Sequence, residues 1–137
     1  MSTVLAARAP WLSRPVQRLI VFAGGLACVG DGITTYVGVR SAGVDAEANP
    51  VQAQIMRSAG LIPALALRVL LGVLLFVLVV EVAERFPFKL ARGLAYAVAV
   101  FGVLETWLVV ANNYSAELFQ RNLLPGWLIQ LIFGWLS

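Results

Sequence analysis

Residues 61–80 read LIPALALRVLLGVLLFVLVV. Fifteen of these residues are Leu, Ile, Val or Phe, and the only charged one is Arg68. Each of the fifteen favours membrane insertion by roughly 0.3–0.6 kcal/mol, so together they outweigh the roughly 2.5–3.5 kcal/mol penalty of one charge at mid-span. Such a run of α-helix also covers about 30 Å, the thickness of the hydrocarbon core. The stretch therefore predicts a membrane-spanning helix.

The composition of the whole chain agrees with this prediction. The 137 residues are 61% hydrophobic and only 12% charged, whereas a soluble domain averages about 25% charged residues. We therefore expect an all-α integral membrane protein with one polytopic domain over residues 1–137, and a lipid bilayer as its immediate partner.

Three spans are predicted when each is allowed one charge, at residues 19–39, 58–80 and 93–116. The first is the weakest, because it has only nine Leu, Ile, Val or Phe residues together with five glycines and Asp31. Its favourable insertion sum, about 3–5 kcal/mol, nearly equals the cost of one aspartate. This span therefore needs neighbouring helices.

The two ends of the chain allow more than one arrangement. Residues 1–18 form a basic leader, either a flexible one or a short amphipathic helix on the inner leaflet. Residues 122–137 are apolar but short for a full crossing. We expect a short fourth helix there, either a tilted span or one lying in the interface.

Each predicted span carries one ionisable residue near its middle: Asp31, Arg68 and Glu105. With spans of alternating direction, all three lie about 10–15 Å below the outer ends of their helices. We predict that Arg68 lies between the two acids or bonds to one of them, since pairing lowers the cost of burying each charge. Alternatively, the charges only fix helix packing, or Arg68 snorkels outward.

Polar residues extend these positions along the helix faces. Thr34 and Thr35 lie about one turn after Asp31, and Asn112 and Asn113 lie two turns after Glu105. We predict that all of them belong to one intramembrane polar cluster, which more often marks an inward-facing seam than a solvated cavity.

The loop between the first two spans contains Glu47, Asn49 and Pro50. Asn49 followed by Pro50 is typical of a helix start, and Gln52 would complete a capping box. Capping alone explains Asn49. Alternatively, Glu47 and Asn49 fold back over Asp31 and close the polar cluster.

Basic residues set the expected orientation of the chain. Six flank the predicted inner ends of the spans: Arg8, Arg14, Arg18, Arg85, Lys89 and Arg92. Three flank the outer ends: Arg40, Arg57 and Arg121. The N-terminus is therefore expected on the cytoplasmic side.

The order of these motifs resembles a family of small prokaryotic multipass membrane proteins defined as a domain of unknown function. The family has an Asp-x-x-x-Thr step in its first span, matched here by Asp31 and Thr35, and then a Glu-x-Asn-Pro motif, matched by residues 47–50. The resemblance covers roughly residues 20–115. It implies the architecture and the polar positions, with Arg68 as the basic residue of the next span, and it implies no activity.

The residue inventory argues against catalysis and metal binding. The chain has no histidine and a single cysteine, Cys28, so Ser-His pairs, His-metal sites and Cys-only metal sites are absent from the sequence. We expect no enzyme activity, no metal and no cofactor. The basic residues flank the spans and form no patch suited to nucleic acid.

Two functions remain. The first is a structural or accessory subunit of a membrane assembly, either a homo-oligomer or a larger complex, which suits a small chain with glycine-rich helix faces. The second is an oligomeric proton or cation channel or transporter that uses Asp31, Arg68 and Glu105.

Overall fold

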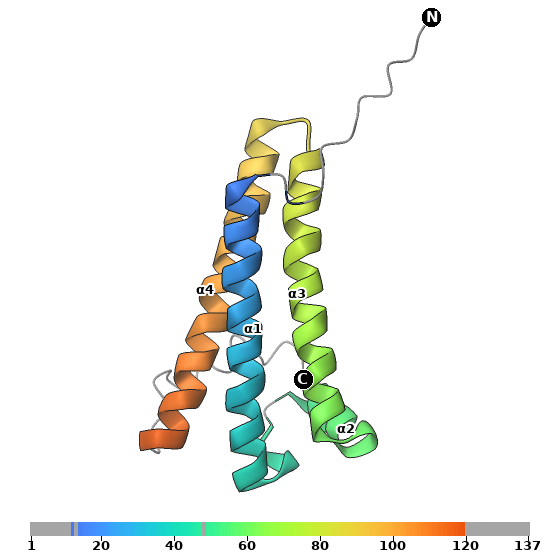
Figure 1. Ribbon diagram of the computed structural model, residues 1–137, viewed down its shortest axis with the longest axis vertical. Helices are drawn as coiled ribbons and strands as arrows, with labels where there is room; N and C mark the ends of the chain where they lie inside the picture. The colour runs from blue at the N-terminus through green and yellow to red at the C-terminus, as the bar shows by residue number, and fades with distance from the viewer. Residues whose placement is uncertain (1–11, 13, 48, 120–137) are drawn as a thin grey trace, which may run out of the picture.

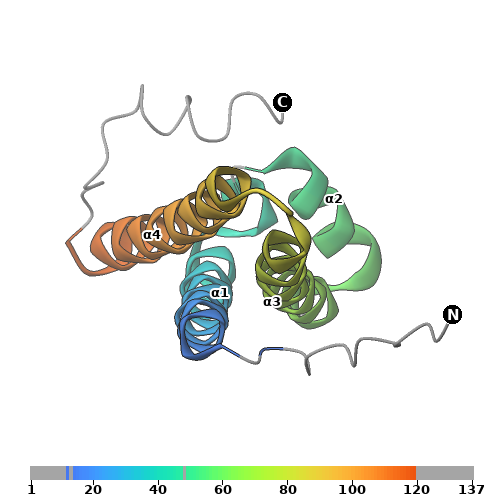
Figure 2. The ribbon, with the colours of Figure 1, turned by 90° about the horizontal axis from the view of Figure 1, so that it is seen from above.

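The computed structural model describes residues 12, 14–47 and 49–119, and all of the secondary structure in these residues is helical. The three long helices of the described residues are α1 (Pro15–Ala42), α3 (Leu61–Arg85) and α4 (Lys89–Phe119), and α3 runs antiparallel to the other two. A short 3-10 helix, η1 (Val44–Ala46), and the helix α2 (Pro50–Ala59) join α1 to α3 (Figure 1). Seen along the bundle, α2 lies outside the three long helices and beside α3 (Figure 2).

The all-α fold class predicted from the sequence is confirmed for this part of the chain. The three long helices are each long and apolar enough to cross a membrane. They extend beyond the predicted hydrocarbon spans of residues 19–39, 58–80 and 93–116, because a helix can continue through the interface. Most of the leader and all of residues 122–137 lie outside the described residues.

Local signals explain where the helices begin and end. Helix α1 begins at Pro15, and the Arg14 backbone N–H donates a hydrogen bond to Oε1 of Gln17 (2.9 Å). Gly60 separates α2 from α3 with a φ of +91°, a value that side-chain-bearing residues rarely adopt. The predicted second span therefore has a break at Gly60, and the residues before it belong to α2.

The start of α2 confirms one prediction and corrects another. The Asn49 side chain accepts hydrogen bonds from the backbone N–H groups of Val51 (3.0 Å) and Gln52 (3.2 Å), and Pro50 is the first helical residue. Gln52, however, does not complete a capping box. Its side-chain amide donates to the backbone carbonyl of Ala64 instead (3.2 Å) and so ties α2 to α3.

The bundle has little interior, because most apolar side chains point outward. One buried cluster joins the three long helices near the start of α1 and contains Ile20, Val80, Ala99 and Val103. A second contains Val39, Met56, Ala64 and Leu65, where α1, α2 and α3 meet. Elsewhere, large side chains such as Phe22 (65% exposed) and Phe101 (71% exposed) face outward, as expected of helices surrounded by lipid.

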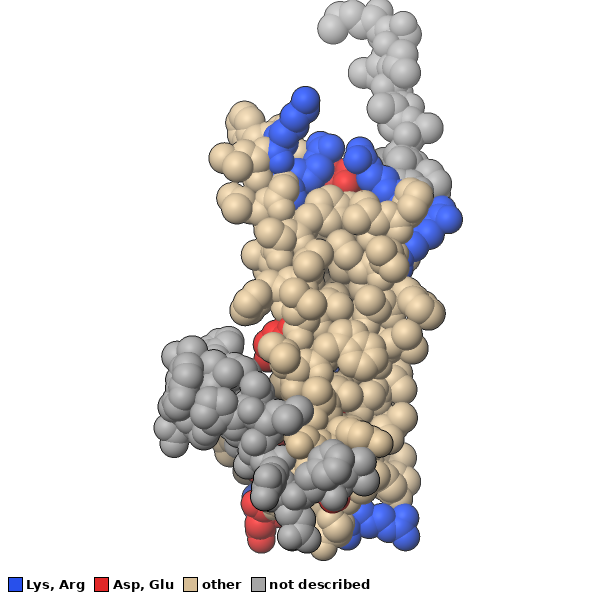
Figure 3. Space-filling view, turned by 90° about the vertical axis from the view of Figure 1, so that its left-hand side faces the viewer, with Lys and Arg blue, Asp and Glu red and all other residues tan. Residues whose placement is uncertain are grey.

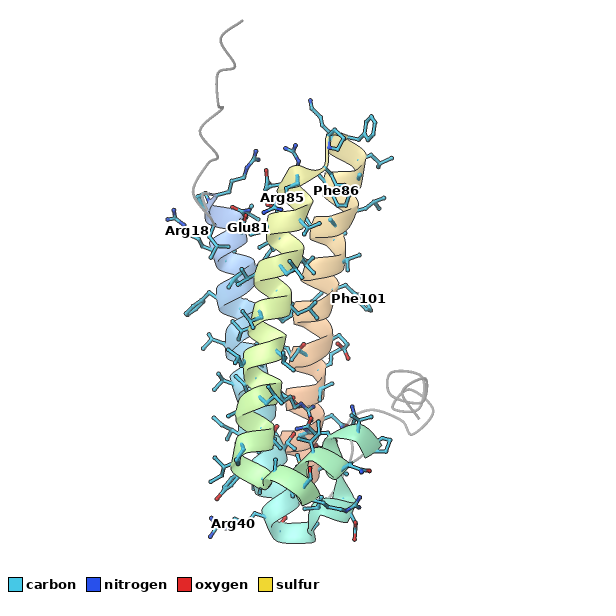
Figure 4. All side chains as sticks on the ribbon, turned by 90° about the vertical axis from the view of Figure 1, so that its right-hand side faces the viewer. Arg18, Arg40, Glu81, Arg85, Phe86 and Phe101 are labelled. Carbon is cyan, nitrogen blue, oxygen red and sulfur yellow. The ribbon has the colours of Figure 1, made fainter. Side chains whose placement is uncertain are left out.

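The two ends of the bundle differ in charge. The basic end is formed by the start of α1, the end of α3 and the start of α4, and Lys and Arg side chains gather there (Figure 3). The loop end is formed by the end of α1, by η1 and α2, and by the end of α4. Figure 4 shows Arg18, Glu81 and Arg85 at the basic end and Arg40 at the loop end.

Candidate functional site

A buried ion network joins α1, α3 and the loop. Nη2 of Arg68 lies 2.7 Å from Oδ2 of Asp31, and its Nη1 lies 3.4 Å from Oε2 of Glu47. The side chains of Asp31 and Glu47 are each 8% exposed, and that of Arg68 is 26% exposed. The predicted bond between Arg68 and a mid-span acid is therefore present, with Asp31 as the acid.

The second acid on Arg68 is Glu47 and not Glu105. Side chains of an α-helix tilt toward its N-terminus. Helix α3 begins at the loop end, so its arginine reaches toward η1, whereas α4 begins at the basic end and its glutamate is directed away. Of the two predicted arrangements, the structure therefore has the second, in which Arg68 bonds to one mid-span acid, Asp31.

The loop is fixed in place by hydrogen bonds around this network. Oε1 of Glu47 accepts a hydrogen bond from the backbone N–H of Asn49 (2.9 Å), while Oε2 of Glu47 faces Arg68. Asn49 in turn caps α2. The structure therefore has one part of each predicted alternative: Asn49 caps α2, and Glu47 reaches the network of Asp31 and Arg68.

Two polar side chains link α1 to α4 at the same level. The Asn113 side-chain amide donates to the Thr34 hydroxyl (3.3 Å). That hydroxyl lies 3.1 Å from the backbone carbonyl of Gly30 and 3.2 Å from that of Asp31. Thr35 is buried one turn after Asp31.

A polar cavity of about 360 Å³ lies beside the network. Its walls come from α1, η1, α3 and α4, and its polar lining consists of Thr34, Thr35, Glu47, Arg68, Asn112, Asn113 and Glu117. Helix α4 inclines away from α3 toward the loop end, as Figures 1 and 2 both show. Two of the predicted elements, the threonine pair and the asparagine pair, therefore meet across one cavity.

Glu117 is a cavity residue that the sequence reasoning did not assign to the cluster. A Cβ atom at Gly38 would lie 2.9 Å from Oε1 of Glu117, so the glycine lets this carboxylate approach α1. The sequence contains a pattern that predicts this position, because Glu117 follows Asn113 by four residues and therefore lies on the same face of the helix.

The cavity and its network carry more negative than positive charge. Asp31, Glu47 and Glu117 supply three carboxylates against the single guanidinium of Arg68. In addition, Oδ1 of Asp31 is buried and has no hydrogen-bond partner among the described residues. The site therefore favours a cationic or hydrogen-bond-donating guest over an anion.

Glu105 forms no direct bond with the network, although its carboxylate lies within electrostatic range of Asp31. It is half-buried in the middle of α4 and makes no hydrogen bond or ion pair with any described residue. Its neighbours on the outer side of the helix, Leu104 (58% exposed) and Leu108 (51% exposed), face outward.

A second polar network at the basic end was not predicted. Oε2 of Glu84 lies 3.1 Å from Nε of Arg14 and 3.7 Å from Nη1 of Arg92. Oε1 of Glu84 accepts a hydrogen bond from the Tyr96 hydroxyl (2.6 Å). These contacts tie all three long helices together. The sequence placed the arginines at this end but gave no pattern that paired them with Glu84.

The fold and the site define a small multipass membrane protein with an ion network and a polar cavity in one half of the bundle. Residues 22–115 match a domain of unknown function, DUF5658, and the chain belongs to that family. No curated protein and no solved structure matches the chain.

Proposed function

We propose that this protein is a non-enzymatic structural or accessory subunit of a membrane assembly, and that α4 forms its contact with another chain around Glu105. The observation that supports this most directly is the unpaired state of Glu105 among the described residues. A carboxyl group at mid-span costs roughly 2.5–3.5 kcal/mol against lipid. Contact with a donor on a second copy or on a larger complex removes much of that cost.

The polar cluster supports the same proposal by being largely engaged within the chain. Arg68 is shared by Asp31 and Glu47, so it holds α1, α3 and the loop in one arrangement. Such a network fixes helix packing before any partner binds. The residue left over for contact between chains is Glu105.

The candidate nucleophiles support a non-enzymatic role. The Thr34 hydroxyl lies against two backbone carbonyls of its own helix. Cys28 is buried where α1 meets α3, and a Cβ at Gly72 would lie 2.6 Å from its sulfur. Neither group is paired with a general base in the described residues, as nucleophilic catalysis requires.

Replacing Glu105 with leucine is the test of this proposal. We expect Glu105→Leu to weaken assembly about tenfold, which is roughly 1.4 kcal/mol, because one polar contact within the membrane is lost. Native mass spectrometry in nanodiscs measures the copy number and bound chains together. Leu75→Ala, at an exposed position on α3 and outside the proposed contact, is the control and should assemble like the wild type. A wild-type protein that stays monomeric and without partners in its own membrane would refute the proposal.

We further propose that the basic end faces the cytoplasm. This is supported by five basic side chains there, Arg14, Arg18, Arg85, Lys89 and Arg92, against two acidic ones, Glu81 and Glu84. The described residues of the loop end contain as many acidic as basic groups outside the buried network. In this orientation the polar cavity opens toward the outside.

A second candidate is an oligomeric proton or cation channel or transporter, and the polar cavity favours it. Three carboxylates lie in or beside that cavity in the loop-end half of the bundle. Intramembrane acids of this kind are frequent in ion pathways. The three long helices of the described residues, even with the predicted fourth, are too few to enclose a pathway, so conduction would need several copies.

Ion flux through membrane vesicles of known sidedness tests this candidate and the orientation together. We expect Glu117→Gln to reduce cation flux about tenfold, because it removes one carboxylate from the cavity without touching the buried network. Asp45→Asn, an exposed acid outside the cavity, should leave flux unchanged. Spermine added on the outside should block flux if the cavity faces outward. Flux equal to that of empty vesicles would eliminate the candidate.

A further inference from the structure

An apolar groove lies between α1 and α3 on the membrane-facing surface, away from the polar cavity. Its volume is about 600 Å³, and it extends from Tyr36 and Ile62 at the loop end to Val29 and Val73 near the middle of the bundle. Gly32 and Ala66 are part of its lining. A Cβ atom at Gly32 would lie 2.9 Å from Cγ2 of Val69, so this glycine lets α1 approach α3 along the groove.

The length of the groove corresponds to one leaflet. Ile62 and Val73 are eleven residues apart on α3. At about 1.5 Å per residue this is roughly 16 Å, about half of the 30 Å hydrocarbon core. The groove therefore follows the depth that one acyl chain of the loop-end leaflet occupies.

The guanidinium of Arg40 lies at the mouth of the groove. Nη1 of Arg40 donates to the hydroxyl of Tyr36 (2.7 Å), and the guanidinium carbon lies 5.8 Å from the centre of the Tyr36 ring. Arg40 is exposed and forms no ion pair with any described carboxylate. The other arginines described at this end are both paired, Arg57 with Asp45 and Arg68 with Asp31 and Glu47.

We propose that this groove binds a phospholipid, with one acyl chain along the apolar lining and the phosphate on Arg40. Arginine is well suited to the phosphate, because its planar fork of N–H donors matches phosphate oxygens. Tyr36 joins the two parts of the site, since its ring lines the groove and its hydroxyl holds the guanidinium at the mouth. The proposal is independent of the assembly contact at Glu105, which lies on a different helix.

The test is native mass spectrometry of the full chain with phosphatidylglycerol, compared with diacylglycerol, which has the chains but no phosphate. We expect one phosphatidylglycerol retained per chain and about tenfold weaker retention of diacylglycerol. Arg40→Gln should reduce phosphatidylglycerol retention about tenfold and leave diacylglycerol unchanged. Ala66→Phe should reduce both, because the ring fills the groove.

Two variants serve as matched controls. Arg57→Gln removes a positive charge from the same end of the bundle but outside the groove, and Ala111→Phe adds the same ring to the exposed face of α4. Both should retain phosphatidylglycerol like the wild type. Equal retention by Arg40→Gln and the wild type would overturn the proposal, as would an equal loss with Arg57→Gln, which would indicate attraction by charge alone. If the wild type is a dimer, and Ala66→Phe is a monomer with unchanged lipid retention, the groove binds a second copy and the lipid proposal fails. Inorganic phosphate should not compete, since the site needs the chain as well.

Discussion

Arg68→Met is expected to lower the free energy of unfolding by about 3–5 kcal/mol, the usual cost of removing one member of a buried ion pair. The loss is large because one guanidinium serves two carboxylates that are each 8% exposed. Without it, Asp31 and Glu47 remain buried close to one another with no compensating charge. Reversible unfolding in detergent or bicelles, followed by circular dichroism, measures the difference.

The exposed pair of the loop end provides the matched control. Nη2 of Arg57 and Oδ1 of Asp45 lie 2.5 Å apart, but the side chains of Arg57 and Asp45 are 56% and 90% exposed. Arg57→Met should therefore cost about 1 kcal/mol or less, as exposed pairs do. The double variant Asp31→Leu, Arg68→Met should lose less stability than Arg68→Met alone, because it also removes one of the stranded carboxylates. If both arginine variants lose the same small amount, the buried network does not hold the bundle together.

The fold was predictable because a membrane restricts the possibilities. Apolar runs broken by single charges predicted three long helices, and the described residues contain three helices that are long and apolar enough to cross a membrane. The common depth of Asp31 and Arg68 predicted their ion pair. Both predictions use only the hydrophobicity of each residue and the rise per residue of a helix. Because both quantities are known from the sequence, the sequence is sufficient for these predictions.

The rest of the site depends on the directions in which side chains point, and a hydrophobicity pattern does not specify these directions. The choice of Glu47 over Glu105 as the second acid on Arg68 follows from the tilt of side chains toward each helix's own N-terminus. The same rule was available from the sequence once the helix directions were predicted. By contrast, the contact of Glu84 with Arg14, Arg92 and Tyr96 depends on how the three helices are rotated against one another. No pattern within a single helix fixes that rotation.

The glycines of α1 determine part of that rotation. Two adjacent glycines, Gly24 and Gly25, have different surroundings, so alanine is expected to have opposite effects at the two positions. A Cβ at Gly24 would lie 2.6–2.8 Å from ring atoms of Phe76 on α3, closer than real Cβ contacts. The same ring lies 3.4 Å from the Cβ position of Gly102 on α4, so it is held between two helices. At Gly25 the nearest atom, Cγ2 of Val73, is 3.8 Å away, which is ordinary contact.

Gly24→Ala is therefore expected to destabilise the bundle, and Gly25→Ala is not. Overpacking costs about 1–3 kcal/mol, which in Gly24→Ala is only partly offset by the gain of up to about 1 kcal/mol that alanine brings to a helix interior. Gly25→Ala keeps the gain without the clash, so the two variants should differ by about 1–3 kcal/mol in unfolding free energy. Adding Phe76→Leu to Gly24→Ala should recover part of the loss, because a smaller side chain removes the collision. Equal stabilities of the two alanine variants would mean that α1 and α3 can separate around the ring at no cost, and that close packing at Phe76 does not set the arrangement of the three helices.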